Sequence, residues 1–217
     1  MYPHHGAVKA GGPPAVRELP DLVITKVSVG PMDNNAYLLR CRDTGEQLLI
    51  DAANDAATLL KLVNGSLAKV VTTHQHADHW QALREVVEAT GAQTYAGRLD
   101  ADGIPVPTDV TLDDGSKVTV GRVTLEAIHL AGHTPGSIAL LYDDPKGYPH
   151  LFTGDCLFPG GPGRTTNPRE FNSLMDDLEA KLFAKLPDET WVYPGHGNDT
   201  TLGDERPRLK EYRDRGW

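Results

Sequence analysis

Four separate strand-like runs of this chain are each followed by histidine or aspartate. After every run, the first of these residues lies beside glycine or threonine. Residues that end neighbouring strands meet at one edge of a sheet, where distant parts of a sequence can form one site. The pattern therefore predicts a fold in which one sheet edge collects these side chains. They are His74, His76, Asp78, His79, His133, Asp155 and His196.

The spacing inside the first cluster divides it into two sets of ligands. His74 and His76 are two residues apart, so in an extended segment they point the same way and can chelate one ion. The chain then turns towards a helix, which directs Asp78 and His79 to a second ion. Imidazole and carboxylate without thiolate favour zinc, iron or manganese in a catalytic site. A carboxylate such as Asp155 can bridge two ions, and two such ions can polarise a carbonyl and generate hydroxide near neutral pH.

Each of these residues has a simpler interpretation when it is taken alone. Asp78 can cap the helix expected to begin near Trp80. A single loop histidine, such as His133 or His196, is more often a hydrogen-bonding residue than a metal ligand. Asp155 can be an ordinary turn residue. The coincidence of four such strand ends favours metal binding over four unrelated explanations.

Segments of strand character dominate the chain and occur in two runs, each accompanied by helical segments. The first run lies between about residues 21 and 96 and the second between about residues 117 and 193. This order favours an α/β fold made of two β-rich halves over regularly alternating β–α–β units. We expect one domain over residues 21–217, preceded by a flexible leader over residues 1–20 that contains Gly11-Gly12-Pro13-Pro14.

Length, charge and cysteine content narrow the class of function. The 217 residues suffice for one good-sized core, and a formal charge of −9 argues against a nucleic-acid partner. The first twenty residues contain neither a signal-peptide core nor a membrane span, and we expect no membrane partner. Two scattered cysteines, Cys41 and Cys156, suit a reducing compartment. We expect a cytoplasmic protein with a small-molecule substrate, and the oligomeric state stays open.

Several motifs resemble those of a known family. The ligand-type residues, in their order and spacing, are similar to the signature of the metallo-β-lactamase superfamily, and the flanking motifs resemble its glyoxalase II branch. The resemblance extends from about residue 22 to residue 202. The flanking motifs are Asp33-Asn34-Asn35-Ala36-Tyr37-Leu38-Leu39, Gly132-His133-Thr134-Pro135-Gly136-Ser137, Phe152-Thr153-Gly154-Asp155 and Tyr193-Pro194-Gly195-His196-Gly197.

The resemblance implies an αββα sandwich that holds two divalent metal ions, with zinc as the first expectation and iron or manganese as alternatives. One ion would be held by His74, His76 and His133, and the other by Asp78, His79 and His196. Asp155 would bridge the two ions, and Asp78 and Asp155 would be the catalytic carboxylates. Asp51 matches a further acid of the family, which would orient a ligand histidine or form a strand-end hydrogen bond.

The same resemblance implies an enzyme similar to hydroxyacylglutathione hydrolase, which hydrolyses a thioester with a metal-activated hydroxide. The substrate would be an acyl-thiol or an ester. Two alternatives share the fold: a persulfide dioxygenase-like enzyme with a single iron, and a lactonase or other ester hydrolase. A binding module without chemistry is a third possibility, but it predicts lost ligand residues, and all seven are present.

Two positions outside the ligand set bear on the substrate. Gln75 lies between ligand residues, where many relatives carry a small hydroxyl residue, so we expect it to shape the pocket and not the number of metals. Arg164 lies in the glycine-rich loop of residues 157–165. It can bind a substrate carboxylate or be a solvated loop charge, and the sequence favours the second interpretation slightly.

Overall fold

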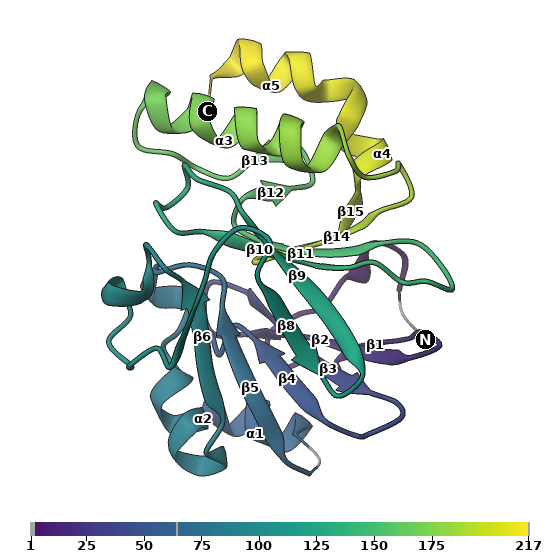
Figure 1. Ribbon diagram of the computed structural model, residues 1–217, viewed down its shortest axis with the longest axis vertical. Coiled ribbons are helices and arrows are strands. Elements are labelled where there is room, and N and C mark those ends of the chain that lie inside the picture. Colours follow the sequence, from purple (N-terminus) through teal and green to yellow (C-terminus); the bar gives the residue numbers. More distant parts are fainter. Residues whose placement is uncertain (1–2, 64, 217) are drawn as a thin grey trace.

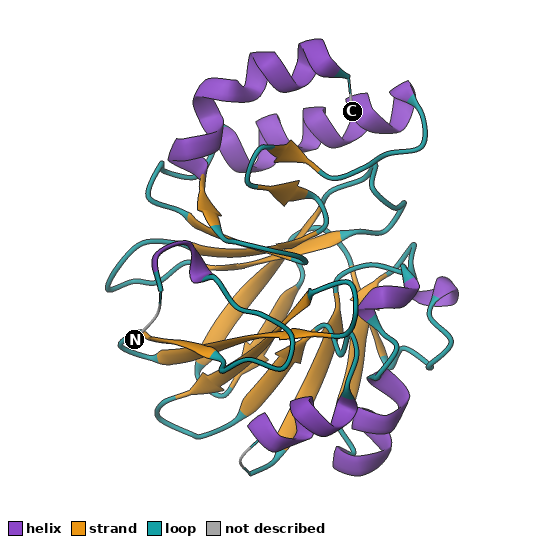
Figure 2. Cartoon of the chain, turned by 180° about the vertical axis from the view of Figure 1, so that it is seen from behind, coloured by secondary structure: helices purple, strands orange, loops and turns teal. Residues whose placement is uncertain are grey.

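Two β-sheets pack face to face in the computed structural model, which describes residues 3–63 and 65–216 (Figure 1). Met1 and Tyr2 of the predicted leader and Trp217 of the predicted domain lie outside the described residues. Helices cover the outer face of each sheet, so the layers run helix, sheet, sheet, helix, as Figure 2 shows from behind. The predicted αββα sandwich is confirmed.

The first sheet has seven strands in chain order, and it changes from antiparallel to parallel pairing at β4. Helices α1 (Ala56–Leu62) and α2 (Leu83–Thr90) connect the parallel strands and cover this sheet. Its strands are β1 Ala15–Glu18, β2 Leu22–Val29, β3 Asn34–Cys41, β4 Gln47–Ile50, β5 Leu67–Thr72, β6 Gln93–Gly97 and β7 Val110–Leu112.

The second sheet has six strands in the order β15-β14-β11-β10-β9-β8, and β11 and β14 are its parallel pair. Helix α3 (Pro168–Asp177), the π-helix η4 (Leu178–Phe183) and α5 (Leu209–Arg215) cover its outer face. The strands are β8 Lys117–Val120, β9 Val123–His129, β10 Ile138–Tyr142, β11 His150–Gly154, β14 Trp191–Pro194 and β15 Thr200–Thr201.

Short elements complete the described chain. A two-stranded ribbon follows β11, and α4 (Leu202–Glu205) precedes α5. The ribbon and the single-turn helices are β12 Leu157–Phe158, β13 Gly161–Pro162, η1 His4–Gly6, η2 Ala77–His79, η3 Ala101–Gly103 and η5 Arg206–Arg208.

The alternation of side chains along the strands explains the layers. In β4, Leu48 and Ile50 enter the core between the sheets, whereas Leu49 packs under α1 and α2. In β11, Phe152 faces the core between the sheets and Leu151 faces α3. Each strand therefore contributes apolar side chains to two cores, which is why both sheets need a helical cover.

The predicted boundary between the leader (residues 1–20) and the domain (residues 21–217) lies too late in the sequence. Ala15–Glu18 forms β1, which pairs antiparallel with β2 from Ala15↔Lys26 to Glu18↔Val23. The flanking proline and glycine residues concealed this strand, because they are typical of loops. Residues 15–20 thus belong with the domain, and β1 places Arg17 over the ring of Trp191 at 3.9 Å.

Candidate metal centre

The predicted site residues meet at one end of the strands. His74–His79 follow β5, His133 lies in the β9–β10 connection, and Asp155 and His196 follow β11 and β14. The structure brings all seven predicted side chains together, because their ligand atoms form three overlapping groups with internal distances of no more than 4.8 Å. The groups are His74–His76–His133, His74–His79–Asp155 and Asp78–His79–His196.

The first group consists of three imidazoles whose ring nitrogens converge. His133 Nε2 lies 2.9 Å from His76 Nδ1 and 3.3 Å from His74 Nε2. His133 Nδ1 donates to the backbone oxygen of Arg164 at 2.7 Å, so His133 Nε2 presents a lone pair to the group. Burial and the neighbouring His79 lower the pKa of His74, which keeps that ring neutral. Converging imidazole nitrogens suit a cation.

The group Asp78–His79–His196, called the second group below, joins one carboxylate to two imidazoles. Asp78 Oδ2 lies 3.4 Å from His79 Nε2 and 3.2 Å from His196 Nε2. Asn34 Nδ2 donates to the same oxygen at 2.9 Å, and Asn34 and His196 also form an isolated β-bridge. His196 Nδ1 donates to the backbone oxygen of Met32 at 3.0 Å, which leaves Nε2 for the group.

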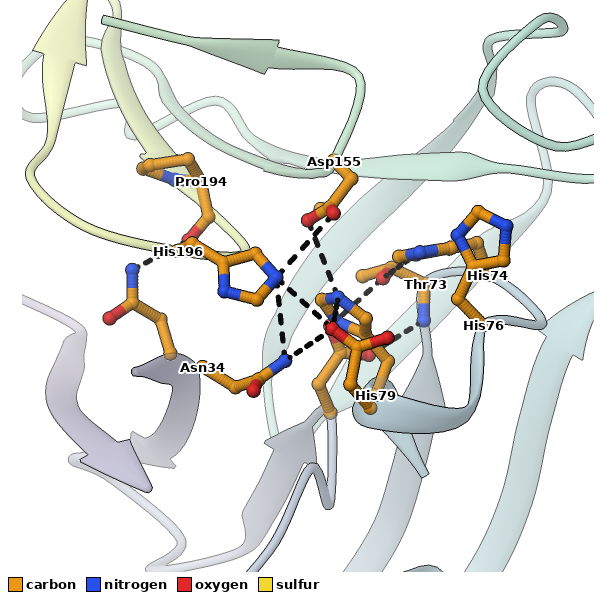
Figure 3. Close-up of polar contacts among 12 residues, drawn as sticks. Asn34, Thr73, His74, His76, His79, Asp155, Pro194 and His196 are labelled. Carbon is orange, nitrogen blue, oxygen red and sulfur yellow. Dashed lines mark hydrogen bonds and ion pairs between the residues drawn. The ribbon is translucent and has the colours of Figure 1, made fainter. Parts of the chain in front are cut away.

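Asp155 lies between the two groups (Figure 3). Its Oδ1 is 3.4 Å from His79 Nε2, and its Oδ2 is 3.7 Å from His133 Nε2 and 3.5 Å from His196 Nε2. Asp155 Oδ1 and His79 Nε2 are both buried without a hydrogen-bond partner among the described residues. Buried polar atoms without partners are costly, and a cation at this point would satisfy both.

Asp51 orients His79. Its Oδ2 accepts from His79 Nδ1 and from Thr73 Oγ1, each at 2.8 Å, and its Oδ1 accepts from Thr73 N at 2.8 Å. The bond to Nδ1 turns Nε2 of His79 towards Asp155. Burial alone would lower the pKa of His79, but the carboxylates of Asp51 and Asp155 raise it to about 10. Asp51 thus combines the two roles that the sequence left open, since it bonds at a strand end and orients a histidine.

The interpretation of Asp78 as a helix cap is wrong. Asp78 lies in the single turn η2, whose N-cap is His76. Helix α2 begins only at Leu83, with Ala82 at its N-cap and no side-chain capping bond. The Asp78 carboxylate instead accepts from Asn34 and faces the two histidines.

Glycine at position 195 permits the close approach of three segments. A Cβ atom built on Gly195 would lie 2.2 Å from Asp155 Oδ1 and 2.7 Å from His79 Cε1. Gly195 also donates its N–H to Gly154 O at 2.8 Å and accepts from Asn35 N at 2.7 Å. The loop that carries His196 can therefore pack against Asp155 only with glycine at this position.

Several positioning residues were not predicted from the sequence. Lys26, Asn35 and Asp199 hold the His196 loop, since Lys26 and Asn35 both donate to Gly197 O. The motif Asp33-Asn34-Asn35 was noted without a role, and it could have pointed to this contact. Arg164 contributes its backbone oxygen to His133, and its side chain is exposed.

Comparison with known proteins agrees with this geometry. Residues 29–196 match the family model of the metallo-beta-lactamase superfamily. The chain belongs to this superfamily. The three overlapping groups of histidine and aspartate fit the two-metal site typical of the metallo-beta-lactamase fold.

Relatives within the superfamily include the hydroxyacylglutathione hydrolase of Polaromonas sp., which is 35% identical over 179 residues. That match covers 81% of this chain and 66% of the Polaromonas enzyme. The hydroxyacylglutathione hydrolase of Fuscovulum blasticum is 36% identical over 168 residues, with 76% of this chain and 62% of the relative covered. This chain therefore spans somewhat less than two thirds of the length of these two relatives.

A solved structure gives the same result for the fold. ETHE1 from Myxococcus xanthus superposes with a TM-score of 0.76 at 30% identity, covering 87% of this chain and 84% of that protein. No helix in the described parts of the chain is long and apolar enough to cross a membrane.

Proposed function

We propose that this chain is a metal-dependent thioester hydrolase of the glyoxalase II type, which uses a metal-activated hydroxide. The observation that carries the proposal is Asp155, which lies between two three-residue groups with an unsatisfied, buried oxygen. One group supplies three imidazoles and the other adds a carboxylate, as expected for two adjacent divalent ions.

The seven side chains divide between two ions in this proposal. His74, His76 and His133 would hold the first ion, Asp78, His79 and His196 would hold the second, and Asp155 would be shared. Zinc suits this nitrogen and oxygen donor set, and iron or manganese are the alternatives. A protein 33% identical to this chain, TTHA1623, has been crystallised in a di-iron-bound form, with a TM-score of 0.67 and 83% of this chain and 96% of that protein covered. Two bound ions would supply hydroxide near neutral pH and polarise the substrate carbonyl.

The chain's own residues prepare the centre for this chemistry. Hydrogen bonds to Asp51, Arg164 O and Met32 O fix the rings of His79, His133 and His196, so no ring must reorient during a turnover. No protein nucleophile is needed. Cys156 next to Asp155 is buried, and burial raises the pKa of its thiol, which leaves it in the unreactive protonated form.

The thioester assignment draws on the relatives. Two of them, 35% and 36% identical, are named hydroxyacylglutathione hydrolases. The single-iron alternative, a persulfide dioxygenase-like enzyme, can keep the residues of the second group without binding metal there. Metal content and oxygen uptake therefore separate the two functions, and in this chain Asn34 holds the carboxylate of the second group in place. Enzymes that hydrolyse lactones or other esters would use the same metal centre and would differ in the pocket that binds the substrate.

The test is turnover by the metal-loaded protein on three substrates: a 2-hydroxyacyl glutathione thioester, a simple lactone and glutathione persulfide. The proposal expects thioester cleavage with release of a free thiol, at a kcat/KM at least about a hundredfold above that for the lactone. Oxygen uptake with the persulfide, without thioester cleavage, would replace the proposal by the dioxygenase alternative. The variant H76A changes an exposed residue of the first group and tests whether the activity belongs to the centre.

A further inference from the structure

Asp100 is a completely buried aspartate that lies outside the seven candidate ligands. It follows β6 and stands at the N-cap position of the single turn η3, where aspartate is common. Its side chain makes no capping bond to that turn, so capping does not explain the residue. Burying a carboxylate is costly unless hydrogen bonds compensate it, which directs attention to the donors around Asp100.

The Asp100 carboxylate accepts hydrogen bonds from two loops that are far from it in the sequence. Oδ2 accepts from Gln75 N at 3.0 Å and from Thr134 Oγ1 at 2.5 Å, and Oδ1 accepts from Gly136 N at 2.6 Å. Hydrogen bonds to a charged acceptor are stronger than those between neutral groups. One side chain therefore joins the loop after β5 to the loop between β9 and β10.

These two loops carry all three histidines of the first group. Gln75 lies between His74 and His76, and Thr134 directly follows His133. The Gln75 N–H belongs to a planar peptide unit, so a bond to it restricts the direction of the chain on both sides. The carboxylate thus fixes how far apart the two loops lie, and the convergence of the three imidazoles depends on that separation.

His76 depends most on the placement of its backbone. The other two rings contact residues outside the group, since His74 Nδ1 lies 3.0 Å from Thr73 Oγ1 and His133 Nδ1 donates to Arg164 O. Within the described parts of the chain, the His76 ring has a hydrogen-bonding contact only with His133, and it is exposed. The neighbouring peptide, which Asp100 holds, is therefore what directs this ring.

Glycine at position 136 permits the close approach of the carboxylate. A Cβ atom built on Gly136 would lie 2.8 Å from Asp100 Oδ1 and 2.8 Å from the backbone carbon of Leu99. Thr134 Oγ1 contacts Ser137 Oγ as well as Asp100, so the hydroxyl groups of this loop also face the buried carboxylate. The β9–β10 loop is thus packed around Asp100.

We infer that Asp100 is a positioning residue for the first ion, the one assigned to His74, His76 and His133. It acts by holding the two loops together, whereas Asp51 acts on the second ion by orienting a ligand ring. The inference rests on the two-ion centre of the proposed function and is independent of the substrate. It requires the two aspartates to act on different ions.

The variant D100N keeps the size of the side chain and removes one acceptor. An amide has a single oxygen, so its NH2 group must face either the Gly136 N–H or the donors of Gln75 and Thr134, and one loop is released. Because partners that orient metal ligands are worth about 10–100-fold in metal affinity, binding of the first ion should weaken by that factor.

Two backgrounds separate the ions: H196A is expected to retain only the first ion, and H133A only the second. Competition for zinc with a chelator should show the 10–100-fold loss for D100N in H196A and no loss in H133A. D51N should give the opposite pattern. D109N is the matched control, because Asp109 also accepts from a backbone N–H and a threonine hydroxyl, both of Thr94, at the start of β6 and remote from the centre.

Amide hydrogen exchange of the metal-free protein is a second measurement that needs no ion. D100N should speed exchange of the Gln75 or the Gly136 N–H about tenfold or more, and leave that of Thr73 N–H, which bonds to Asp51, unchanged. Unchanged exchange at both amides would overturn the inference. Faster exchange with unaltered zinc affinity would also overturn it, because the contact would then be structural only.

The remaining outcomes are equally decisive. An equal loss of zinc affinity in the H196A and H133A backgrounds would contradict a role at one ion. Absence of zinc from both backgrounds would contradict the two-ion centre and this inference with it. The expected zinc pattern in a protein that cleaves no thioester would support the role of Asp100 and contradict the proposed reaction alone.

Discussion

Lys26 Nζ lies 2.6 Å from Asp199 Oδ1, and both side chains are completely buried. Lys26 also donates to Gly197 O at 2.7 Å, and Trp191 Nε1 donates to Asp199 Oδ2 at 2.8 Å. These contacts join β2 to the loop that carries His196, over 173 positions of sequence. Burial lowers the pKa of Lys26 and the charge of Asp199 opposes that shift. The Lys26–Asp199 pair therefore holds the loop that carries His196, which forms one side of the candidate metal centre.

Replacing Lys26 by methionine should destabilise the metal-free protein by about 3–5 kcal/mol, because Asp199 would remain buried without its cation. Urea denaturation of the metal-free protein measures this change. The double variant K26M/D199N also removes the carboxylate charge and should recover part of the loss. An unchanged free energy of unfolding in K26M would show that the pair does not hold the loop.

Replacing Asp51 by asparagine should weaken binding of the second ion by about 10–100-fold, because the acceptor that orients His79 becomes an amide. Competition with a chelator on the metal-loaded protein gives the affinity. D55N is the matched control, since Asp55 caps α1 on the exposed surface and should alter stability only slightly and metal affinity not at all. Equal metal affinity in D51N and D55N would contradict the assigned role of Asp51.

Replacing Gly195 by alanine should displace Asp155 or His79, because the new Cβ atom would lie 2.2 Å from Asp155 Oδ1. We expect loss of at least one bound ion and a fall in activity of about a hundredfold or more. G197A is the control, because nothing lies within 4 Å of its Cβ position and only its positive φ of 70° adds strain. Metal content and turnover that are the same in both variants would count against the close packing at Gly195.

His150 makes stability depend on pH. Its Nδ1 bonds with Tyr193 OH at 2.8 Å, and burial lowers its pKa from 6.5 to about 3. Above pH 6.5 the ring is neutral in the folded and the unfolded protein, so the contribution of His150 to the free energy of unfolding is fully present. As the pH falls from 6.5 towards 3, only the unfolded chain gains this proton, and unfolding becomes easier by up to about 1.4 kcal/mol per pH unit. In urea denaturation of the metal-free protein, the free energy of unfolding of H150Q should fall less steeply between pH 7 and 4.5 than that of the unaltered protein. Equal slopes for the two proteins would refute this.

The ligand residues were predictable because their signal is local. The first ligand residue after each strand-like run lies beside glycine or threonine, and strand ends converge whatever the details of packing. The second run of strand character was predictable because strand character is a local property of the sequence, and this run begins with Lys117–Val120 and Val123–His129.

The positioning residues were not predictable, because their partners are distant in sequence. Nothing near Lys26 indicates that Asp199 will neutralise it, and a lysine in a strand is usually exposed. β1 was missed because its pairing with β2 determines it, while its local composition is typical of a loop.

Metal content per chain tests the two-ion centre most directly. Elemental analysis of purified protein, loaded with zinc and dialysed, should give about two ions for the unaltered chain, about one for H196A and none for D155A. The proposed centre requires this order, since His196 lies in one group and Asp155 lies close to a histidine of each group. One ion in the unaltered chain, with the same value in H196A, would contradict it.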